Sequence, residues 1–408
     1  MNKKEEIKNR IDLINKGEVP EGYKKNKGYI IPDVWDIYPA GNIFKNLSIK
    51  NTDNSEQNVL SVTQDRGVIP REDVGIDIKY NEESLNSYKK VKKGNFIISL
   101  RSFQGGIEYS QYDGIVSPAY TILENILPIN DYFYATYLKM DGFIKRLNTA
   151  VYGIRDGKQI GYDDFSIIPT IYPPKQEQEK IAEILSCCDK VIELKEQLIK
   201  HYYEKRNFII GYFLKNIKSK NIVKLRDICE MFSGGTPSVE NRQYYNNGTI
   251  PFIKSGEIEN DKTEDYITED GLKNSSAKLV KQGDLLVALY GANSGNVALS
   301  KISGAVNQAI LCIRSSFIDC YYLLILLKFN KDRIIQKYLQ GGQGNLSAQI
   351  IKSLKFKIPT IEEQKKIVTI ISNIDKELKL LEQELEQYKQ LKKALSQLLL
   401  TGIVRTME

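Results

Sequence analysis

The sequence Ile-Pro-Thr-Ile occurs at residues 168–171 and again at 358–361. Each copy is followed by Glu-Gln, at 177–178 and at 363–364, and then by a long apolar pattern with a heptad period. The offset between the copies is slightly larger at the tetrapeptide than within the heptad pattern, which gives the first copy four extra residues. Solenoid repeats are about 20–50 residues long, so this is a duplicated domain with its helix. The chain is expected to have a front half and a back half of similar shape.

A second pair of matching stretches lies upstream. Val-Lys-Lys-Gly-Asn-Phe-Ile-Ile-Ser-Leu at 91–100 matches Val-Lys-Gln-Gly-Asp-Leu-Leu-Val-Ala-Leu at 280–289. The apolar run after the glycine predicts a strand in both halves. Short strand-like runs broken by Gly, Asn, Asp and Pro surround each stretch. Each half is therefore expected to be a mixed α/β domain, and the whole chain to be of the α+β class.

Composition sets wide bounds on the class of protein. The 408 residues suffice for two to three domains, and 41% of them are hydrophobic, which is ordinary for a soluble protein. No run of about 18 apolar residues predicts a membrane span, and the charged N-terminus lacks a secretion signal. The five cysteines form no Cys-x-x-Cys pair, which indicates a reduced, cytoplasmic protein. The net charge of +7 permits a nucleic-acid partner without requiring one.

The pattern divides the chain into five segments. The predicted segments are an N-terminal helix and extended stretch (1–32), a first domain (33–175), a central long helix (176–215), a second domain (216–360) and a C-terminal long helix (361–401). One further helix is predicted within each domain, near 132–147 and near 321–339.

The two long helices carry matched apolar seams. Ten positions in each helix alternate steps of three and four residues, and eight of ten are apolar in the first helix and nine of ten in the second. A sustained 3.5-residue period is typical of coiled-coil packing. We therefore expect the two helices to pack antiparallel against each other, with pseudo-two-fold symmetry; the alternative is that each helix lies on its own domain. The residues predicted to pack are Ile181, Leu185, Ile192, Ile199, Tyr202, Ile209, Ile367, Ile371, Leu378, Leu385, Tyr388 and Leu395.

Several catalytic chemistries lack their residues in this sequence. The single histidine, His201, lies in the heptad helix, so Ser-His-Asp and Cys-His catalysis have no candidate base. No phosphate-binding Gly-x-x-x-x-Gly-Lys-Ser/Thr loop or zinc-ligand spacing occurs. The stretch at 172–175, Tyr-Pro-Pro-Lys, resembles the Asp/Asn-Pro-Pro-Tyr/Phe motif of amino-methyltransferases, but its first and fourth residues cannot perform those roles. No catalytic residue and no metal site are predicted.

The breaks between predicted strands contain residue types that read DNA. Arg pairs with guanine, Asn or Gln pairs with adenine, and glycine lets the backbone approach a phosphate. Such residues follow equivalent strands in both halves, which favours a role beyond ordinary surface loops. In the first half the candidates are Gln64, Arg66, Arg71, Arg101, Ser102, Gln104, Arg155, Lys158 and Gln159. In the second half they are Ser233, Gly234, Gly235, Thr236, Lys254, Ser255, Tyr290, Asn293, Ser294, Asn307, Gln308, Gln343 and Asn345.

The order and duplication of these motifs resemble a known family. The pattern Glu-Gln-x-x-Ile-x-x-x-Leu/Ile-x-x-x-Asp occurs at 177–189 and at 363–375, together with Asp-Gly-Ile-Val-Ser-Pro-Ala-Tyr at 113–120 and Gly-Gly-Thr-Pro-Ser at 234–238. With these motifs the whole chain closely resembles the specificity subunit of type I restriction–modification systems. One departure is that the second copy has only Pro359 where the first has two prolines, at 173–174.

The resemblance implies a role and a set of partners. It implies a non-catalytic subunit with two target-recognition domains, each reading one half of a bipartite, asymmetric site in double-stranded DNA. It implies two adenine methyltransferase subunits and restriction/translocase subunits as partners, which would bring S-adenosylmethionine, ATP and Mg. This chain itself would need no cofactor. The open alternatives are the specificity subunit of a combined restriction–methylation enzyme or of a motor-less methyltransferase, an enzyme with an unfamiliar carboxylate site, and a coiled-coil adaptor without DNA.

Overall fold

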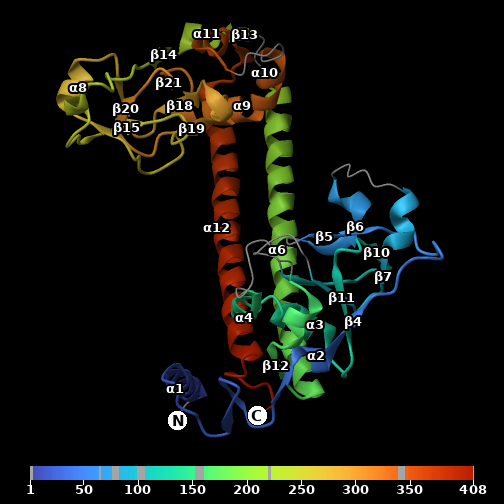
Figure 1. The fold of residues 1–408 in the computed structure, drawn as a ribbon. Coiled ribbons are helices and arrows are strands. Elements are labelled where there is room, and N and C mark those ends of the chain that lie inside the picture. The colour runs from blue at the N-terminus through green and yellow to red at the C-terminus, as the bar shows by residue number, and fades with distance from the viewer. Residues whose placement is uncertain are drawn as a thin grey trace. The chain divides into compact units, whose positions relative to one another are not determined.

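The chain forms two compact units, each with one globular domain and one half of each long helix (Figure 1). Unit 1 comprises Met1–Leu194 and Leu385–Glu408, and unit 2 comprises Lys195–Glu384. The long helices are α6 (Lys175–Lys215) and α12 (Ile361–Leu400). The computed structural model describes residues 3–63, 66–75, 82–98, 106–151, 160–218, 222–338 and 345–407.

The domain of unit 1 is built around a four-stranded antiparallel sheet. Its strands, in spatial order, are β4 (Phe44–Leu47), β11 (Thr121–Asn125), β8 (Phe96–Ile98) and β9 (Ile107–Tyr109). All three residues of β8 are buried, as the continuous apolar run predicts. Phe44 and Phe96 lie edge to face, with ring centroids 5.4 Å apart, in the core that this sheet shares with the helix α3 (Asp131–Tyr137).

Shorter elements complete unit 1. Its strand pairs are β1 (Tyr23–Asn26) with β2 (Tyr29–Pro32), β3 (Asp36–Pro39) with β12 (Pro169–Tyr172), β5 (Leu60–Thr63) with β6 (Gly67–Pro70), and β7 (Lys89–Val91) with β10 (Gly114–Val116). Its other helices are α1 (Lys3–Asn15), α2 (Ala40–Ile43), α4 (Asp141–Val151) and α5 (Tyr162–Ser166), with 3-10 turns η1 (Arg71–Val74) and η2 (Glu82–Ser87).

Unit 2 repeats this plan. Its corresponding sheet has the order β14 (Glu230–Ser233), β21 (Ile310–Arg314), β18 (Leu285–Ala288) and β19 (Val297–Leu299). A second sheet contains β16 (Tyr266–Ile267), β15 (Ile250–Ile253), β20 (Gly304–Val306) and β17 (Lys278–Val280), and β13 (Ile222–Lys224) pairs with β22 (Lys355–Lys357). The helices are α7 (Leu225–Ile228), α8 (Glu269–Lys273), α9 (Cys320–Phe329), α10 (Lys331–Tyr338) and α11 (Ala348–Ser353), with 3-10 turns η3 (Arg242–Tyr244) and η4 (Gly291–Asn293).

The central strands of the two domains are equivalent. The sheet β4-β11-β8-β9 corresponds to β14-β21-β18-β19, and the pairs β7–β10 and β3–β12 correspond to β17–β20 and β13–β22. Even an unusual parallel contact is shared: β15 pairs with β20 in parallel, and Val59 forms a parallel bridge to Ile115 of β10. The predicted fold class, two similar mixed α/β domains with two long antiparallel helices, is confirmed.

The opening tetrapeptides are not structurally equivalent, which corrects one inference from the sequence. The amide of Ala40 donates to the Ile168 carbonyl at 2.9 Å, and the amide of Leu225 donates to the Leu354 carbonyl at 3.0 Å. Ile168 therefore corresponds to Leu354, and the first Ile-Pro-Thr-Ile lies at the start of β12. The second lies after β22, against the start of α12. The four extra residues inferred for the first copy are a result of matching these unrelated tetrapeptides.

The single helix predicted in each domain is in fact two helices. The region 132–147 is divided between α3 and α4, and the region 321–339 between α9 and α10. In unit 2 the break lies at Asn330, whose side-chain amide donates to the Leu326 carbonyl at 2.8 Å. Asn competes with the helical backbone for hydrogen bonds, so it favours a helix end over a helix interior.

The long helices match their predicted bounds to within about a residue and run antiparallel within each unit. In unit 1, Ile181 and Leu185 near the start of α6 share a core with Leu399 and Leu400 at the end of α12. Of the twelve residues predicted to pack between the helices, eleven are buried or half-buried, and only Tyr388 is exposed, at 39%. In unit 2, Lys195 of α6 pairs with Glu384 of α12 at 2.6 Å.

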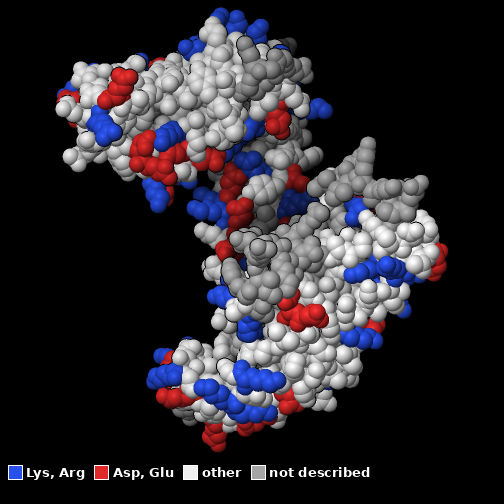
Figure 2. Space-filling model, in the orientation of Figure 1, with Lys and Arg blue, Asp and Glu red and all other residues white. Residues whose placement is uncertain are grey.

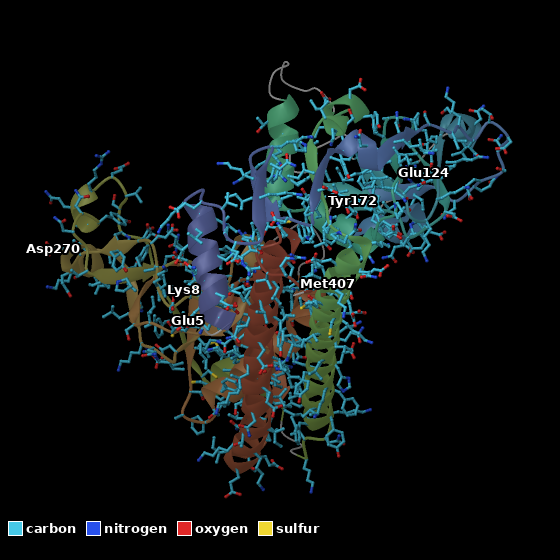
Figure 3. The ribbon with its side chains drawn as sticks, turned by 90° about the horizontal axis from the view of Figure 1, so that it is seen from below. Glu5, Lys8, Glu124, Tyr172, Asp270 and Met407 are labelled. Atoms are coloured by element: carbon cyan, nitrogen blue, oxygen red, sulfur yellow. The ribbon has the colours of Figure 1, made fainter. Side chains whose placement is uncertain are left out.

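The chain ends of unit 1 are held at the start of α6. The Arg405 guanidinium donates to the buried Glu177 carboxylate at 2.6 and 2.9 Å, and the Trp35 indole donates to the same carboxylate at 2.7 Å. Arg10 of α1 donates to the Ile403 carbonyl at 2.9 Å. Figure 3 views this end of unit 1 from below. These contacts tie the segments before β3 and after α12 to one helix start.

Candidate functional site

A carboxylate, a cation and a tyrosine join the two long helices to the domain of unit 2. Asp375 of α12 accepts hydrogen bonds on both oxygens of its carboxylate: Arg206 of α6 donates from Nε to Oδ1 and from Nη2 to Oδ2, the latter at 3.2 Å. The Tyr321 hydroxyl, on α9 of the domain, donates to Oδ2 at 2.6 Å. We call this arrangement the clamp of unit 2. It fixes three separate elements at one carboxylate.

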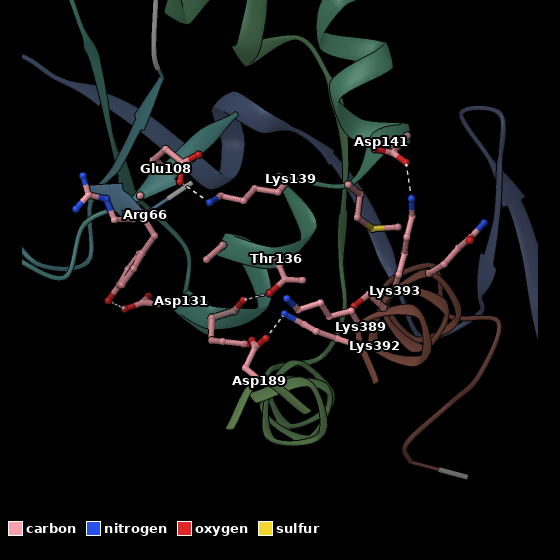
Figure 4. A pocket seen from close by; sticks show the side chains of 18 of the residues that line it. Arg66, Glu108, Asp131, Thr136, Lys139, Asp141, Asp189, Lys389, Lys392 and Lys393 are labelled. Atoms are coloured by element: carbon pink, nitrogen blue, oxygen red, sulfur yellow. Dashed lines mark hydrogen bonds and ion pairs between the residues drawn. The ribbon is translucent and has the colours of Figure 1, made fainter. Parts of the chain in front are cut away.

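The same arrangement occurs in unit 1 with the helices exchanged. Asp189 of α6 accepts hydrogen bonds from Lys392 of α12 and from the Tyr132 hydroxyl of α3 (Figure 4). We call this the clamp of unit 1. Its aspartate and its cation occupy the positions of the repeat that Asp375 and Arg206 occupy in unit 2. In both clamps the cation that interrupts one apolar seam meets the last aspartate of the Glu-Gln motif on the other helix.

The pKa values of the two clamp tyrosines are shifted so that their hydroxyls can donate. Burial, followed by the hydrogen bond to Asp375, raises the pKa of Tyr321, and burial followed by the hydrogen bond to Asp189 raises the pKa of Tyr132. Both hydroxyls therefore stay protonated and donate at neutral pH. The side chains of Arg206 and Asp375 are 18% and 28% exposed, so water screens this pair less than it screens a surface ion pair. A one-residue slip of either helix would separate the charges.

The Glu-Gln motif has a structural role at each helix start. Gln178 and Gln364 are buried, and each accepts a hydrogen bond at 2.8 Å from the backbone amide of a helix-capping residue, Asn130 for α3 and Asp319 for α9. Each glutamine amide also donates to the carbonyl of an upstream proline. The motif therefore joins the start of each long helix to the start of a helix in its own domain, α3 in unit 1 and α9 in unit 2.

The two helix starts differ at the glutamate. Glu177 is 1% exposed and binds Arg405 and Trp35, as described above. Its counterpart Glu363 instead accepts from the Thr360 amide at 3.0 Å, while Thr360 Oγ1 accepts from the Glu363 amide at 3.3 Å. This is a capping box, with threonine in place of the second proline of the first copy. The loss of one proline in the second copy thus accompanies a change in the role of the glutamate. In the first copy it binds a residue near the C-terminus, and in the second it caps its own helix.

A groove of about 890 Å³ lies within unit 1 between the domain and the last turns of α12 (Figure 4). Its lining includes five cations and four carboxylates, so its charge is nearly balanced. Glu108 on β9 forms an ion pair with Lys139, and burial outweighs this pairing to raise the pKa of the Glu108 carboxyl. The clamp of unit 1 and Arg66, one of the residues predicted to read DNA, line the same groove.

Of the residues predicted to read DNA in the first half, two can be placed. Arg66 is exposed and donates to the Asp73 carbonyl at 2.9 Å, while Arg71 is half-buried beside Ser61. The other first-half candidates and one from the second half lie outside the described residues; they are Gln64, Arg101, Ser102, Gln104, Arg155, Lys158, Gln159 and Gln343.

In the second half the structure separates surface candidates from packing residues. Thr236 and Gln308 are exposed and joined by a 2.9 Å hydrogen bond, and Asn345 accepts from the Gly291 amide beside the exposed Tyr290. The other exposed candidate is Lys254, paired with Asp265 at 2.6 Å. Ser255, Asn293 and Asn307 are half-buried.

Three second-half candidates also have a packing role, and their role in reading DNA stays a prediction. A Cβ on Gly234 would lie 1.8 Å from the Val306 carbonyl oxygen, and one on Gly235 would lie 2.1 Å from Ser276 Oγ. Ser294 is buried, and its hydroxyl donates to the Leu289 carbonyl at 2.9 Å. The half-buried Ser233, at the end of β14, pairs with β21. Close packing against Val306 and Ser276 alone is enough to require glycine at these two positions.

Residues 23–201 and residues 217–390 each match the family of type I restriction modification DNA specificity domains. The chain belongs to this family. The two matched regions coincide with the two structural copies, each ending within a long helix. The type I specificity family has a DNA-recognition role, is non-catalytic and carries no catalytic cofactor of its own.

Individual relatives agree with this assignment. The chain is 24% identical to the specificity subunit of the type I restriction enzyme MjaVIII of Methanocaldococcus jannaschii, over 94% of this chain and 96% of that protein. It is 25% identical to the EcoR124I/EcoR124II specificity subunit of Escherichia coli over 51% of this chain and 55% of that protein. Thus the match spans about half the length of the E. coli relative and nearly all of the archaeal one.

Solved structures share the fold. One chain from a type I restriction–modification system covers 92% of this chain with a TM-score of 0.62 and 14% identity. The type I S subunit from M. genitalium covers 94% with a TM-score of 0.55 and 14% identity. Within the described ranges, no helix is long and apolar enough to cross a membrane.

Sequence reasoning missed the clamps, although their signal was present. The seam interruptions Arg206 and Lys392 and the motif residues Asp189 and Asp375 were each visible. Only an antiparallel register brings each cation to the opposite aspartate. The tyrosines of the clamps had no signal beyond equivalent positions in the repeat.

The clamp of unit 2 is tested by reversing its charges. Arg206→Asp or Asp375→Arg alone puts like charges together and should lower the free energy of unfolding by about 2 kcal/mol. The double reversal should recover most of that loss in urea or thermal unfolding. The matched control reverses the exposed pair Lys328 and Glu259, whose side chains are 44% and 59% exposed, and should change little. A double reversal no more stable than the worse single variant would contradict the clamp.

Proposed function

We propose that this chain reads a bipartite, asymmetric DNA site, one half-site with each copy, and holds two adenine methyltransferase subunits on its long helices. The single observation that carries the proposal is that two full copies of a DNA specificity domain occur in one chain on matching sheets. A duplicated reader binds two half-sites, and divergence of its copies makes those half-sites different.

The surfaces of the two copies support an asymmetric target. Arg66 and Arg71 lie beside β6 in the first copy, while Thr236 with Gln308, and Tyr290 near Asn345, are on the surface of the second. Guanidinium groups favour guanine, and amides favour adenine. The two copies share their sheet order but differ in the side chains proposed to contact bases. The sequence of each half-site should therefore be determined by its own copy.

Methylation and cleavage are assigned to partners. The sequence lacks a methyl-transfer motif and a phosphate-binding loop. Methyltransferase subunits would bring S-adenosylmethionine and flip one adenine in each half-site. Restriction/translocase subunits would bring ATP and Mg.

A domain exchange tests whether the two copies read their half-sites independently. Residues 33–165 are replaced by the corresponding segment of a relative, with both long helices left intact. Because each domain has its own core, the methylated motif in cells should change in one half only, with the other half and the spacing unchanged. Sequencing of modified bases provides the readout. A chimera that alters both halves together would contradict independent reading.

A repeated pair of exposed apolar residues supports two equivalent docking sites for methyltransferase. In unit 1, Ile184 and Leu194 of α6 are 39% and 54% exposed; in unit 2, Ile370 and Leu380 of α12 are 41% and 60% exposed. The two pairs are related by the same offset as the heptad seams, so each unit presents an apolar pair at the same positions of its helix. Their repetition favours one partner copy for each unit.

Docking is tested through stoichiometry. Leu194→Glu and Leu380→Glu each place a charge in one proposed apolar contact, which is unfavourable in a buried interface. Native mass spectrometry should show two methyltransferase subunits on the unmodified chain, one on each single variant and none on the double variant. Lys200→Glu, at an exposed position of α6, is the control and should retain two. Loss of both partners from one single variant would refute two independent sites.

A further inference from the structure

A pocket of about 390 Å³ in unit 2 gathers cations without counter-charges. It lies between α10 and β22, and its lining includes Arg333, Lys337 and Lys355 together with the aromatic rings of Tyr338 and Phe356. Among the residues that the structure describes, no carboxylate lines it. The larger groove of unit 1 differs, because there the cations are balanced by four acidic side chains.

The pocket cations lack acidic partners in the structure. Over the described parts of the chain, none of Arg333, Lys337 and Lys355 forms a salt bridge. The ammonium of Lys337 lies over the Tyr338 ring, with its Nζ 5.2 Å from the ring centroid. The sequence from 338 to 361 contains no Asp or Glu at all. The stretch that links α10 to α12 therefore adds no carboxylate to the pocket.

A cross-strand pair places a fourth cation beside the pocket. In the register of β13 with β22, Lys224 lies directly opposite Lys355. Like charges at opposed positions destabilise a sheet, so this pair has a cost to folding that an anion would relieve. Figure 2 shows blue Lys and Arg atoms at the upper edge of unit 2, over the region that Figure 1 labels α10, α11 and β13.

The first copy provides an internal comparison. There the equivalent strands β3 and β12 place Pro39 opposite Pro169, in the positions of Lys224 and Lys355. The fold at this place therefore requires no charge. The lysine pair is a property of the second copy alone, and it needs an explanation other than folding.

We propose that Arg333, Lys337 and Lys355, with Lys224 beside them, form a phosphate site that holds the DNA backbone independently of base sequence. Arg333 and Lys337 are one helical turn apart on α10, so they lie on one face of the helix and, with Lys355, can contact successive phosphates. The inference rests on the proposed reading of DNA and deepens it: the second copy contributes an anchor that the first copy lacks.

The salt dependence of DNA binding tests this site. The variant Arg333→Gln/Lys337→Gln/Lys355→Gln is compared with the unmodified chain, each assembled with methyltransferase. Removing one cation–phosphate interaction should reduce the slope of log affinity against log salt by about 0.9, so the slope should fall by about two to three. Affinity for cognate and for mismatched DNA should fall by the same factor, while the methylated motif stays unchanged.

Two control variants separate an effect of the pocket from a general effect of charge. Lys262→Gln/Lys281→Gln/Lys301→Gln removes the same charge from exposed positions of the same domain and should reduce the slope less. The conservative variant Arg333→Lys/Lys337→Arg/Lys355→Arg should retain the original slope. Equal slopes for the pocket variant and the charge control would overturn the site.

Two further measurements ask whether the phosphate belongs to DNA or to a free ligand, and whether the chain reads a bipartite DNA site at all. Calorimetry with inorganic pyrophosphate should detect no saturable binding to the chain. Pyrophosphate binding that the pocket variant abolishes, with an unchanged DNA slope, would overturn the assignment to DNA in favour of a free phosphate ligand. If the proposed reading of a bipartite DNA site is wrong, cells with the unmodified chain will show no bipartite methylated motif.

Discussion

The antiparallel register of the two long helices rests on two carboxylates, each held by a cation from the other helix. Asp189 binds Lys392 in unit 1, and Asp375 binds Arg206 in unit 2. Apolar seams supply the burial, but a heptad seam alone permits slips by whole turns, whereas a charge at a seam position specifies a register. Because a tyrosine of each domain donates to the same carboxylate, the clamp also fixes where the domain lies on its helix pair. The placement of the two proposed DNA-reading surfaces within their units follows from this constraint.

The two units share their sheet order and their clamps, and they differ at the helix starts and on their surfaces. Unit 1 uses Glu177 to bind Arg405 and Trp35, which anchors the segments near both chain ends; unit 2 uses Glu363 in a capping box. Unit 2 in turn carries the uncompensated cations around Lys355, where unit 1 has proline. We therefore propose that both copies contact DNA bases and that the second copy adds affinity for DNA that does not depend on base sequence.

Much of the fold could be predicted from the sequence, because periodicity reports burial directly. The bounds of α6 and α12 and nearly all of their buried seam follow from a 3.5-residue period. Matching residues between the two copies by identity was less reliable, because Ile168 corresponds to Leu354. Gly234 is required by close packing against Val306, a role that its residue type did not reveal. Residue type cannot distinguish a glycine needed for close packing from one needed for a ligand, because both require a missing Cβ. The charged residues of the clamps were visible in the sequence, but only the antiparallel register pairs them. The cationic pocket depends on contacts between distant segments.

We propose that the clamped helix pair also sets the distance between the two half-sites, and a paired insertion tests this central claim most directly. Four residues added after Lys195 and four after Leu381 lie between the two clamps on both helices, so each clamp stays intact while the pair lengthens by about 6 Å. An insertion in one helix alone would pull the clamps out of register and should abolish activity. The methylated motifs of cells with the paired variant should keep both half-sites and gain one or two base pairs of spacer, since DNA rises about 3.4 Å per pair. An active paired variant with the original spacer would contradict the account.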